Sequence, residues 1–463
     1  DTFQPYLNDI ITILLREILP SVSLTETRLY VLNTLTDIII QTKPLLNKDL
    51  LIEIMQRVPS LWEVSTNNAS ETILSNALLR LLRHLVSSLA QYSYLTWEIS
   101  IPLIRYSCDP SSPQYQLLNE DGFELWGALL QHYSPKEHNV FDPEFIELLP
   151  FLEFAVDART EILPTLLEIV KSYTLILSQA EFLSSDSLLK IFEDMAKYLL
   201  SLREDSYQII LQVWEVLILS NEYGGENLLF SKLYETGVLR AMLDAIFLEE
   251  TLSSYQCGQI FQIIGRLSYL NPNALLESLA QYHQSLPTMN ENAHLPMKSK
   301  KTIFSDSSFD VVVQRFLSQW VVCYKEIYDP KLKKIHIMGM SSLLRTKMIT
   351  IIGDIGLIIS LWIEMMEEIN ENSNGDCEKY HLNDIVTEQS ITYYPLTNEQ
   401  LRQHELEERN DFVHHISFKE FVIQILKFLE DTLGIQRYNE LLSTVNPSLM
   451  ENLQLFLTVK PQQ

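Results

Sequence analysis

The sequence predicts an all-α fold of antiparallel helix pairs, and three observations support this prediction. Apolar residues recur at spacings of three and four, which places them on one face of a helix. No stretch alternates apolar and polar residues for long enough to predict a strand. The composition, with 46% hydrophobic residues and only 12 glycines in 463 residues, is that of an ordered globular chain. Two such apolar stripes are Leu78, Leu79, Leu82, Leu85, Leu89 and Phe418, Phe421, Val422, Ile425, Phe428, Leu429.

Helix starts are marked by a recurring pattern, a hydrogen-bond-accepting side chain followed by proline. The acceptor satisfies backbone N–H groups that have no partner inside the helix, and proline suits the first helical turn. Two capping boxes, Ser23 with Glu26 and Ser417 with Glu420, predict further starts, and Gly434 suits a left-handed helix stop. The acceptor–proline pattern occurs at Asp142-Pro143, Asn271-Pro272, Asp329-Pro330 and Asn446-Pro447.

These marks divide the chain into roughly 18 to 19 helices joined by short polar turns. Two helices form a unit of about 40 residues, which is the period of HEAT or armadillo repeats. Each hairpin in such an array buries its apolar face by stacking on its neighbours. We therefore predict a HEAT-repeat superhelical solenoid, in which no literal motif recurs. The first predicted pairs are 4–19 with 25–41, 46–64 with 70–89, 95–108 with 113–133, and 142–156 with 159–178.

Two segments interrupt the predicted repeats. One contains two prolines and a small basic run, and the other carries 13 acidic residues against 3 basic ones between Glu364 and Asp411, a net charge of −10. The acidic segment would mask an inner surface, recruit basic protein partners or form a solvated loop. The expected segments are HEAT repeats over 1–284, a mobile loop over 285–306, HEAT repeats over 307–370, an acidic, partly disordered insert over 371–411, and C-terminal helices capping the solenoid over 412–463.

The sequence contains no recognisable catalytic, metal-binding or cofactor-binding motif. The ten histidines are scattered, the four cysteines form no C-x-x-C pair, and no P-loop, H-E-x-x-H or G-x-S-x-G occurs. Widely spaced cysteines in a long chain are typical of a reducing compartment. We therefore expect no enzyme, no metal and no cofactor.

The net charge of −26, from 60 acidic and 34 basic residues, argues against direct nucleic-acid binding. Nucleic acids attract clusters of Lys and Arg, whereas an acidic surface suits basic protein partners. The six tryptophans lie within apolar helical periods without interleaved basic residues, so we expect core packing rather than base stacking. They are Trp62, Trp97, Trp126, Trp214, Trp320 and Trp362.

One stretch, from Met348 to Met366, has the length of a membrane span. Asp354 and Glu364 lie within it, and a carboxylate near the centre of a span costs about 3 kcal/mol. No basic cluster marks one flank. We therefore expect a buried helix of the array and no membrane insertion.

Several short motifs follow one another along almost the whole chain. They are Phe3-Gln4-Pro5-Tyr6-Leu7, Pro59-Ser60-Leu61-Trp62, Asp109-Pro110-Ser111-Ser112-Pro113, Glu120-Asp121-Gly122-Phe123-Glu124-Leu125-Trp126, Ala180-Glu181-Phe182-Leu183, Gly265-Arg266, Trp320 and the block 413–457. In this order they resemble the C-terminal half of the importin-eleven type of nuclear transport receptor, within the importin-β (karyopherin) superfamily. The resemblance includes an acidic insert before the last block.

The resemblance implies a monomeric receptor that carries protein cargo into the nucleus. Such receptors shuttle between cytoplasm and nucleus, touch Phe-Gly repeats of nucleoporins in the pore, and release cargo when Ran-GTP binds. Because the chain opens at Asp1 rather than methionine, we expect a fragment whose N-terminal repeats, with the main Ran-binding region, lie upstream. Sequence periodicity alone leaves two alternatives open, a receptor for export and a static HEAT scaffold.

Three carboxylates are the candidate cargo-binding residues. If 113–133 is the second, inner helix of its pair, Glu120, Asp121 and Glu124 project near the concave face and meet basic cargo. The alternative reading is that they are solvated carboxylates on a helix surface.

Overall fold

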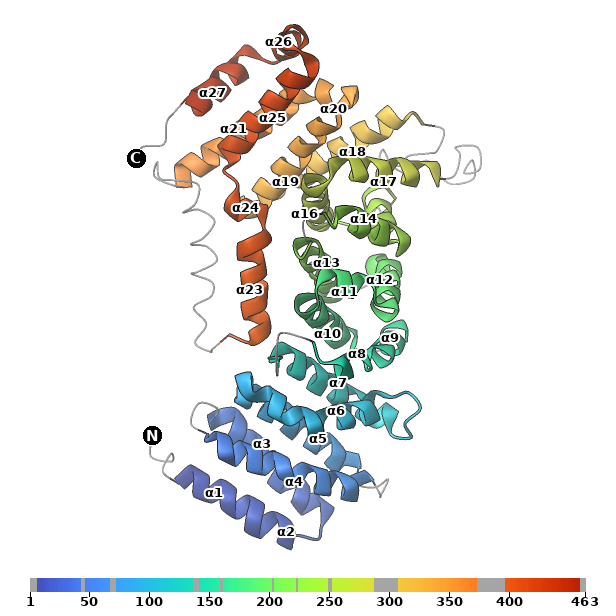
Figure 1. The fold of residues 1–463 in the computed structure, drawn as a ribbon, viewed down its shortest axis with the longest axis vertical. Coiled ribbons are helices and arrows are strands. Elements are labelled where there is room, and N and C mark those ends of the chain that lie inside the picture. Colours follow the sequence, from blue (N-terminus) through green and yellow to red (C-terminus); the bar gives the residue numbers. More distant parts are fainter. Residues whose placement is uncertain are drawn as a thin grey trace. The chain divides into compact units, whose positions relative to one another are not determined.

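The computed structural model describes residues 6–42, 46–66, 72–135, 141–158, 161–201, 204–221, 224–248, 252–286, 307–372 and 396–458 (Figure 1). Over these residues the regular elements are all helical and no strand occurs, which agrees with the predicted all-α class. The chain forms two compact units. Unit 1 comprises Asp1–Asp194 and Pro395–Glu405, and unit 2 comprises Met195–Tyr394 and Leu406–Gln463.

Unit 1 is built from antiparallel helix pairs stacked along the chain (Figure 1). Each second helix packs on the second helix of the next pair, so that α3, α5, α7 and α10 form one continuous layer. Helix α4 packs against α5, and α6 packs against α7. The elements are α1 (Leu7–Ile13), the π-helical turn η2 (Leu14–Ile18), α2 (Leu19–Ser21), α3 (Thr25–Thr42), α4 (Lys48–Thr66), α5 (Thr72–Leu89), the 3-10 segment η5 (Ala90–Thr96), α6 (Trp97–Cys108), α7 (Tyr115–Gln131), α8 (Pro143–Ile146), α9 (Leu149–Asp157), α10 (Leu163–Ile176), α11 (Gln179–Leu183) and α12 (Asp186–Tyr198).

Unit 2 repeats this arrangement, with α13, α16, α19 and α21 packed in sequence. Helix α25 packs on α19, and α27 packs on α21. The elements are η6 (Leu199–Ser201), α13 (Glu204–Leu219), α14 (Glu226–Glu235), α15 (Val238–Phe247), α16 (Ser254–Leu270), α17 (Pro272–Gln284), α18 (Phe309–Tyr324), α19 (Pro330–Ser342), η7 (Leu343–Thr346), α20 (Ile349–Gly353), α21 (Ile355–Asn372), α24 (Phe412–His415), α25 (Phe418–Leu433), α26 (Ile435–Ser443) and α27 (Pro447–Thr458).

The predicted acceptor–proline starts are confirmed at four helices. The side chains of Asp142, Asn271 and Asp329 accept hydrogen bonds from backbone N–H groups of α8, α17 and α19. Asn446 does the same at α27, where the N–H of Ser448 donates over 3.0 Å. Local side-chain chemistry therefore fixes where these helices begin.

Other boundary predictions had mixed outcomes. The Ser417 cap is confirmed, since its hydroxyl accepts from the N–H of Glu420, and Gly434 ends α25 with a φ of +76°, a region that favours glycine. The Ser23 cap is wrong, because α3 begins at Thr25, one residue later than a cap at Ser23 requires. The predicted helix 142–156 is broken into α8 and α9, with Pro150 in the first turn of α9. Proline lacks the N–H that a continuous helix needs there.

The tryptophan prediction holds for five of the six residues. Trp97, Trp126, Trp214, Trp320 and Trp362 are fully buried. The sixth, Trp62, is only half-buried and meets Tyr106 edge-on with ring centroids 5.9 Å apart. Aromatic core packing is thus the role of most of these rings.

The apolar stretch from Met348 to Met366 forms two helices rather than one span. Helix α20 ends at Gly353 and α21 begins at Ile355, with Asp354 at the break. Within the described part of the chain, no helix has the length and apolar character required to cross a membrane.

Of the two interrupting segments, 287–306 and 373–395 lie outside the described residues. The remainder of the acidic segment contains a helix that the sequence analysis did not predict, α23 (Asn398–Asn410). Its residues up to Glu405 belong to unit 1 and those from Leu406 to unit 2.

Candidate protein-binding surface

The three predicted carboxylates lie on α7, the second helix of its pair, in the layer formed with α5. Glu120 is exposed, but Asp121 is only 6% exposed and accepts a hydrogen bond from Nε of Arg80 over 2.8 Å. Glu124 pairs with Arg83. Asp121 and Glu124, three residues apart, thus match two arginines three residues apart on α5.

These ion pairs join neighbouring repeats of unit 1. The hydrogen bond and charge of Asp121 raise the pKa of Arg80. The Arg80 side chain is 61% exposed, so solvent screens much of the attraction. Asp121 and Glu124 therefore act in α5–α7 packing, and cargo binding by the three carboxylates stays a prediction.

The carbonyl groups at and just beyond the C-terminal end of α7 have no partner within the helix. The carbonyl of Leu130 accepts from the N–H of Tyr133 over 3.0 Å, and that of His132 accepts from the hydroxyl of Ser93 over 2.7 Å. The guanidinium of Arg402 donates to the carbonyls of Tyr133, over 2.9 Å, and of Leu130, over 3.0 Å. The side-chain amide of Asn398 donates to His132 over 3.1 Å and to Tyr133 over 3.2 Å. A cation at this position also complements the negative end of the helix dipole.

Beside this contact, Glu399 of α23 is buried against α10, with 5% exposure. It accepts a hydrogen bond from the hydroxyl of Ser172 and lies 3.6 Å from Nζ of Lys171, which also pairs with Glu168 at 2.5 Å. Burial raises the pKa of Glu399, and these partners only partly oppose it. The carboxylate is therefore incompletely compensated.

Arg402 is in a similar situation. Burial lowers its pKa, although the nearby charge of Glu399 opposes the change. Among the described residues, its buried Nε has no hydrogen-bond acceptor. Docking of this part of α23 thus leaves one donor unsatisfied.

In unit 2, a close helix contact positions a second charged cluster. A Cβ on Gly339 of α19 would lie 2.5 Å from Cα of Gly265 on α16, so only glycine permits this approach. The next residue, Arg266, is 3% exposed. Its burial requires acceptors from surrounding elements.

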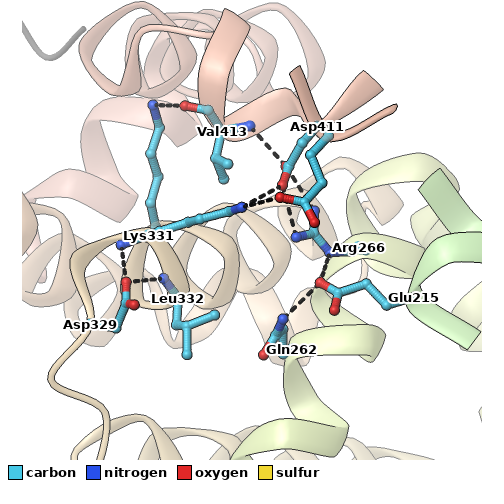
Figure 2. A network of polar contacts seen from close by, with 10 residues as sticks. Glu215, Gln262, Arg266, Asp329, Lys331, Leu332, Asp411 and Val413 are labelled. Carbon is cyan, nitrogen blue, oxygen red and sulfur yellow. Dashed lines mark hydrogen bonds and ion pairs between the residues drawn. The ribbon is translucent and has the colours of Figure 1, made fainter. Parts of the chain in front are cut away.

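Figure 2 shows those acceptors around Arg266. The guanidinium donates to both carboxylate oxygens of Asp411, over 2.7 and 2.9 Å, and to Glu215 of α13 over 2.8 Å. Glu215 also accepts from the amide of Gln262 over 2.7 Å. The planar fork of arginine suits this bidentate pairing.

Asp411 is fully buried and receives further support. Its carboxylate accepts from the N–H of Val413 over 3.2 Å and lies 3.6 Å from Nζ of Lys331, which is 3.5 Å from Glu407 (Figure 2). Burial acts to raise the pKa of Asp411, but the charge and hydrogen bonds of Arg266 outweigh it, so the pKa is lowered. Burial likewise opposes the charge of Arg266, yet Glu215 and Asp411 raise its pKa above the ordinary value.

Three further hydrogen bonds, made by two side chains, hold this end of α23 and the residues that follow it. The buried ammonium of Lys334 donates to the carbonyls of Val413 and Ile416 over 2.9 and 2.7 Å. The amide of Asn410 donates to the carbonyl of Leu219, the last residue of α13, over 2.7 Å. A side chain of α23 thus donates to a carbonyl at the end of α13, as Arg402 does at the end of α7.

Helix α23 docks through polar groups. Its single buried residue is Glu399, and Leu401 is 44% exposed. By contrast, α25 buries Phe418, Phe421, Val422, Ile425 and Leu429. Side-chain charge and carbonyl capping therefore position α23.

This network was not predicted from the sequence. Arg266 entered only as part of a family motif, although an arginine in an otherwise apolar helical stretch signals a buried partner. Within the described residues, no group of three or more His, Cys, Asp or Glu side chains is arranged to hold a metal ion. The described charges and carbonyls bind a segment of the chain itself, residues 398–411.

Comparisons with known proteins agree with the resemblance drawn from the motifs. Residues 76–458 match the family model described as importin-11-like, TPR repeats. The chain is 61% identical over its full length to Importin beta-like protein KAP120 of Saccharomyces cerevisiae, covering 45% of that protein. It is 25% identical to human Importin-11, covering 99% of this chain and 43% of the relative.

A solved structure extends this result to the fold. Lph2, described as a novel bidirectional nuclear transport receptor in S. cerevisiae, is 61% identical and has a TM-score of 0.92, covering 100% of this chain and 46% of that chain. The chain thus spans less than half the length of the relatives it matches. The predicted all-α fold of stacked helix pairs is confirmed, whereas the matched family model describes the repeats as TPR and not HEAT. The chain belongs to the importin-11-like family of the karyopherins.

Proposed function

We propose that this chain is the cargo-binding part of a nuclear import receptor, whose release of cargo is controlled by Ran-GTP. The observation that carries this proposal is 61% identity along the entire chain to an importin beta-like protein. The relatives named above are described as importins or as a nuclear transport receptor, and we propose no enzymatic activity. The receptor shuttles between cytoplasm and nucleus as a monomer, without direct nucleic-acid binding or membrane insertion.

The proposed cargo is a basic protein. A net charge of −26 creates a field that attracts cations and disfavours acidic partners. Exposed Glu120 is available for such contacts, whereas Asp121 and Glu124 are already paired with arginines. If all three bind cargo, the variant carrying Glu120→Gln, Asp121→Asn and Glu124→Gln loses affinity for basic cargo at low salt, and unchanged affinity would contradict this role.

Two further partners belong to the proposal. Ran-GTP would bind mainly through repeats that precede the region matched here, and Phe-Gly nucleoporins would insert side chains between neighbouring helices. Many weak sites of this kind give avidity with rapid release. A solenoid also distributes small displacements over many helix interfaces, so that its grip on cargo can change without one hinge.

Export is the second candidate, because the 61% identical Lph2 is described as bidirectional. An export receptor binds cargo and Ran-GTP together, whereas an import receptor binds them alternately. A static scaffold would hold its partners whether Ran is present or absent.

A pull-down from nuclear and cytosolic extract separates these functions. The baits are the full-length receptor and this chain, each with and without excess GTP-locked Ran. Partners released from the full-length receptor by Ran support import, and their retention on this chain supports cargo binding by these repeats. Partners recruited by Ran would support export, and partners indifferent to Ran would support the scaffold.

A further inference from the structure

We infer that the C-terminal end of α7 is a binding site for an arginine side chain of a basic protein partner, and that the N-terminal half of α23 occupies this site as an internal substitute. The site, named here the α7 arginine site, consists of the carbonyl oxygens of Leu130, His132 and Tyr133. The inference rests on the proposed function only for the nature of the partner, a basic protein.

The geometry of the α7 arginine site fits a guanidinium. Arg402 reaches two of its carbonyls over 2.9 and 3.0 Å, and Asn398 supplies two further N–H···O contacts of 3.1 and 3.2 Å. Arginine carries five N–H donors and no acceptor, so it matches a group of carbonyls. The negative end of the α7 dipole adds to its preference for a cation.

Little apolar burial holds the internal occupant in place. No apolar residue of α23 is buried, and Leu401, next to Arg402, is 44% exposed. The hydrophobic effect scales with apolar area removed from water. It therefore contributes little to the docking of this helix, in contrast to the apolar faces of the repeats.

The charged contacts of the internal occupant are also incompletely satisfied. Nε of Arg402 is buried, and the described part of the chain offers it no acceptor. Docking also buries Glu399, whose pKa is raised by burial even though Ser172 and Lys171 contact it. Buried charges that lack full compensation reduce the net gain of an ion pair. A partner arginine would make the carbonyl contacts without burying a carboxylate.

Release of residues 398–405 does not require release of the other end of α23. Asp411 is held by two hydrogen bonds from Arg266. Phe412 stacks on Tyr269 within unit 2, with ring centroids 4.0 Å apart. Helix α23 thus has a firmly bound C-terminal end and a weakly bound N-terminal arm, residues 398–405. Such an arm can compete with a partner for the α7 arginine site.

Competition predicts that weakening the arm exposes the site. The test uses the 463-residue chain and fluorescein-labelled decaarginine as the probe. The variant carries Asn398→Ala with Arg402→Ala, and the matched control is Arg409→Ala. Arg409 lies on the same helix and is exposed, so its replacement changes net charge equally.

We expect the Asn398→Ala/Arg402→Ala variant to bind decaarginine about tenfold more tightly than the unmodified chain, because an occupied site reduces apparent affinity in proportion to its free fraction. The Arg409→Ala chain should bind like the unmodified one. Equal affinity in all three proteins would overturn the inference. Equal tightening in both variants would also overturn it, because general charge attraction would then explain the binding.

Hydrogen exchange on the unmodified chain provides a second test that needs no substitution. Decaarginine should accelerate exchange at the amides of residues 399–405 and leave those of 412–415 unchanged. No acceleration at 399–405 would overturn the inference.

The outcomes of these two tests can be distinguished from a failure of the proposed transport function. If the exchange and affinity tests fail while Ran-GTP still releases cargo from the full-length receptor, only the α7 arginine site is refuted. If they succeed while cargo is indifferent to Ran, the site stands and the proposed function is refuted.

Discussion

The two ends of α23 are both held by charged side chains, but the surroundings of those charges differ. At the C-terminal end, Asp411 receives two hydrogen bonds from Arg266 and lies near Lys331, and its pKa is lowered. At the N-terminal end, Glu399 has one hydroxyl and a more distant ammonium, and its pKa is raised by burial.

The difference shows that burial alone does not decide whether a charge stabilises a contact. Both carboxylates lose their hydration, but only Asp411 gains a bidentate partner that outweighs this loss. Arg266 is similarly matched by Asp411 and Glu215. Arg402 faces carbonyls, and its Nε has no acceptor within the ranges that the structure describes. The C-terminal end is therefore an anchor and the N-terminal end a weak contact.

The largest expected effect follows from removing the anchor cation. Arg266→Ala leaves Asp411 and Glu215 without their guanidinium, and removal of one partner from a buried pair destabilises by about 4 kcal/mol. Urea unfolding of the variant should show a clearly lower midpoint, together with faster amide exchange in α24. Arg409→Ala, at an exposed position of α23, serves as the control and should unfold like the unmodified chain. Equal unfolding midpoints for the two variants would contradict the anchor.

Replacing each carboxylate by its neutral amide should change stability in opposite directions at the two ends of α23. Asp411→Asn removes the charge that compensates Arg266 and should destabilise unit 2 by about 3 kcal/mol. Glu399→Gln removes a charge that burial disfavours, so docking of the α23 arm should stay the same or strengthen by up to about 1 kcal/mol. Amide exchange at residues 399–405 and urea unfolding measure the two effects. A loss of arm protection in Glu399→Gln comparable to the effect of Asp411→Asn would make the two ends alike.

Acidification should affect the two ends in opposite directions. Because docking raises the pKa of Glu399 above 4.5, the docked arm holds the proton more tightly, so its stabilisation is full below that value and is lost as pH rises through the raised pKa. The lowered pKa of Asp411 makes its contribution full above 3.8 and lost as pH falls through the lowered value. Lowering pH from neutrality towards 4.5 should therefore slow arm exchange several-fold, after correction for intrinsic rates.

Glu399→Gln supplies the control for this pH response, since it removes the titrating carboxylate. A response that persists in the variant would show that Glu399 is not the titrating group and would contradict this assignment. Faster arm exchange on acidification of the unmodified chain would contradict the sign argument.

Periodicity and capping chemistry were sufficient to predict most of the fold. The apolar stripe of α25 and the starts at Asp142, Asn271 and Asp329 depend on neighbours within a few residues, and such local signals are readable in one sequence. The break before α9 was missed because Pro150 was read within a longer helix. Local sequence signals therefore predict where a helix begins better than where it is interrupted.

The polar network was beyond sequence reasoning for a physical reason. Arg266 and Asp411 are separated by 145 positions, and no periodicity links residues so far apart. Helix α23 is polar and acidic, and its helical form is stabilised by contacts to distant elements rather than by an apolar stripe. Similarly, the sequence suggested that Asp121 was a surface carboxylate, because the matching arginine lies on another helix, 41 positions away.

The smallest expected effect concerns the α5–α7 pairs, which test whether an exposed partner weakens a buried carboxylate's contribution. Asp121 is 6% exposed but Arg80 is 61% exposed, and Glu124 and Arg83 are each about one-third exposed. Because water screens such pairs and the arginine can be solvated alone, Arg80→Ala should destabilise by less than about 1 kcal/mol. The pair should also weaken further in high salt, unlike the buried Arg266 pair. Urea unfolding of Arg80→Ala and Arg266→Ala at low and high salt measures the loss of stability in each variant. A loss in Arg80→Ala as large as that in Arg266→Ala would show that exposure of the cation does not set the strength of these contacts.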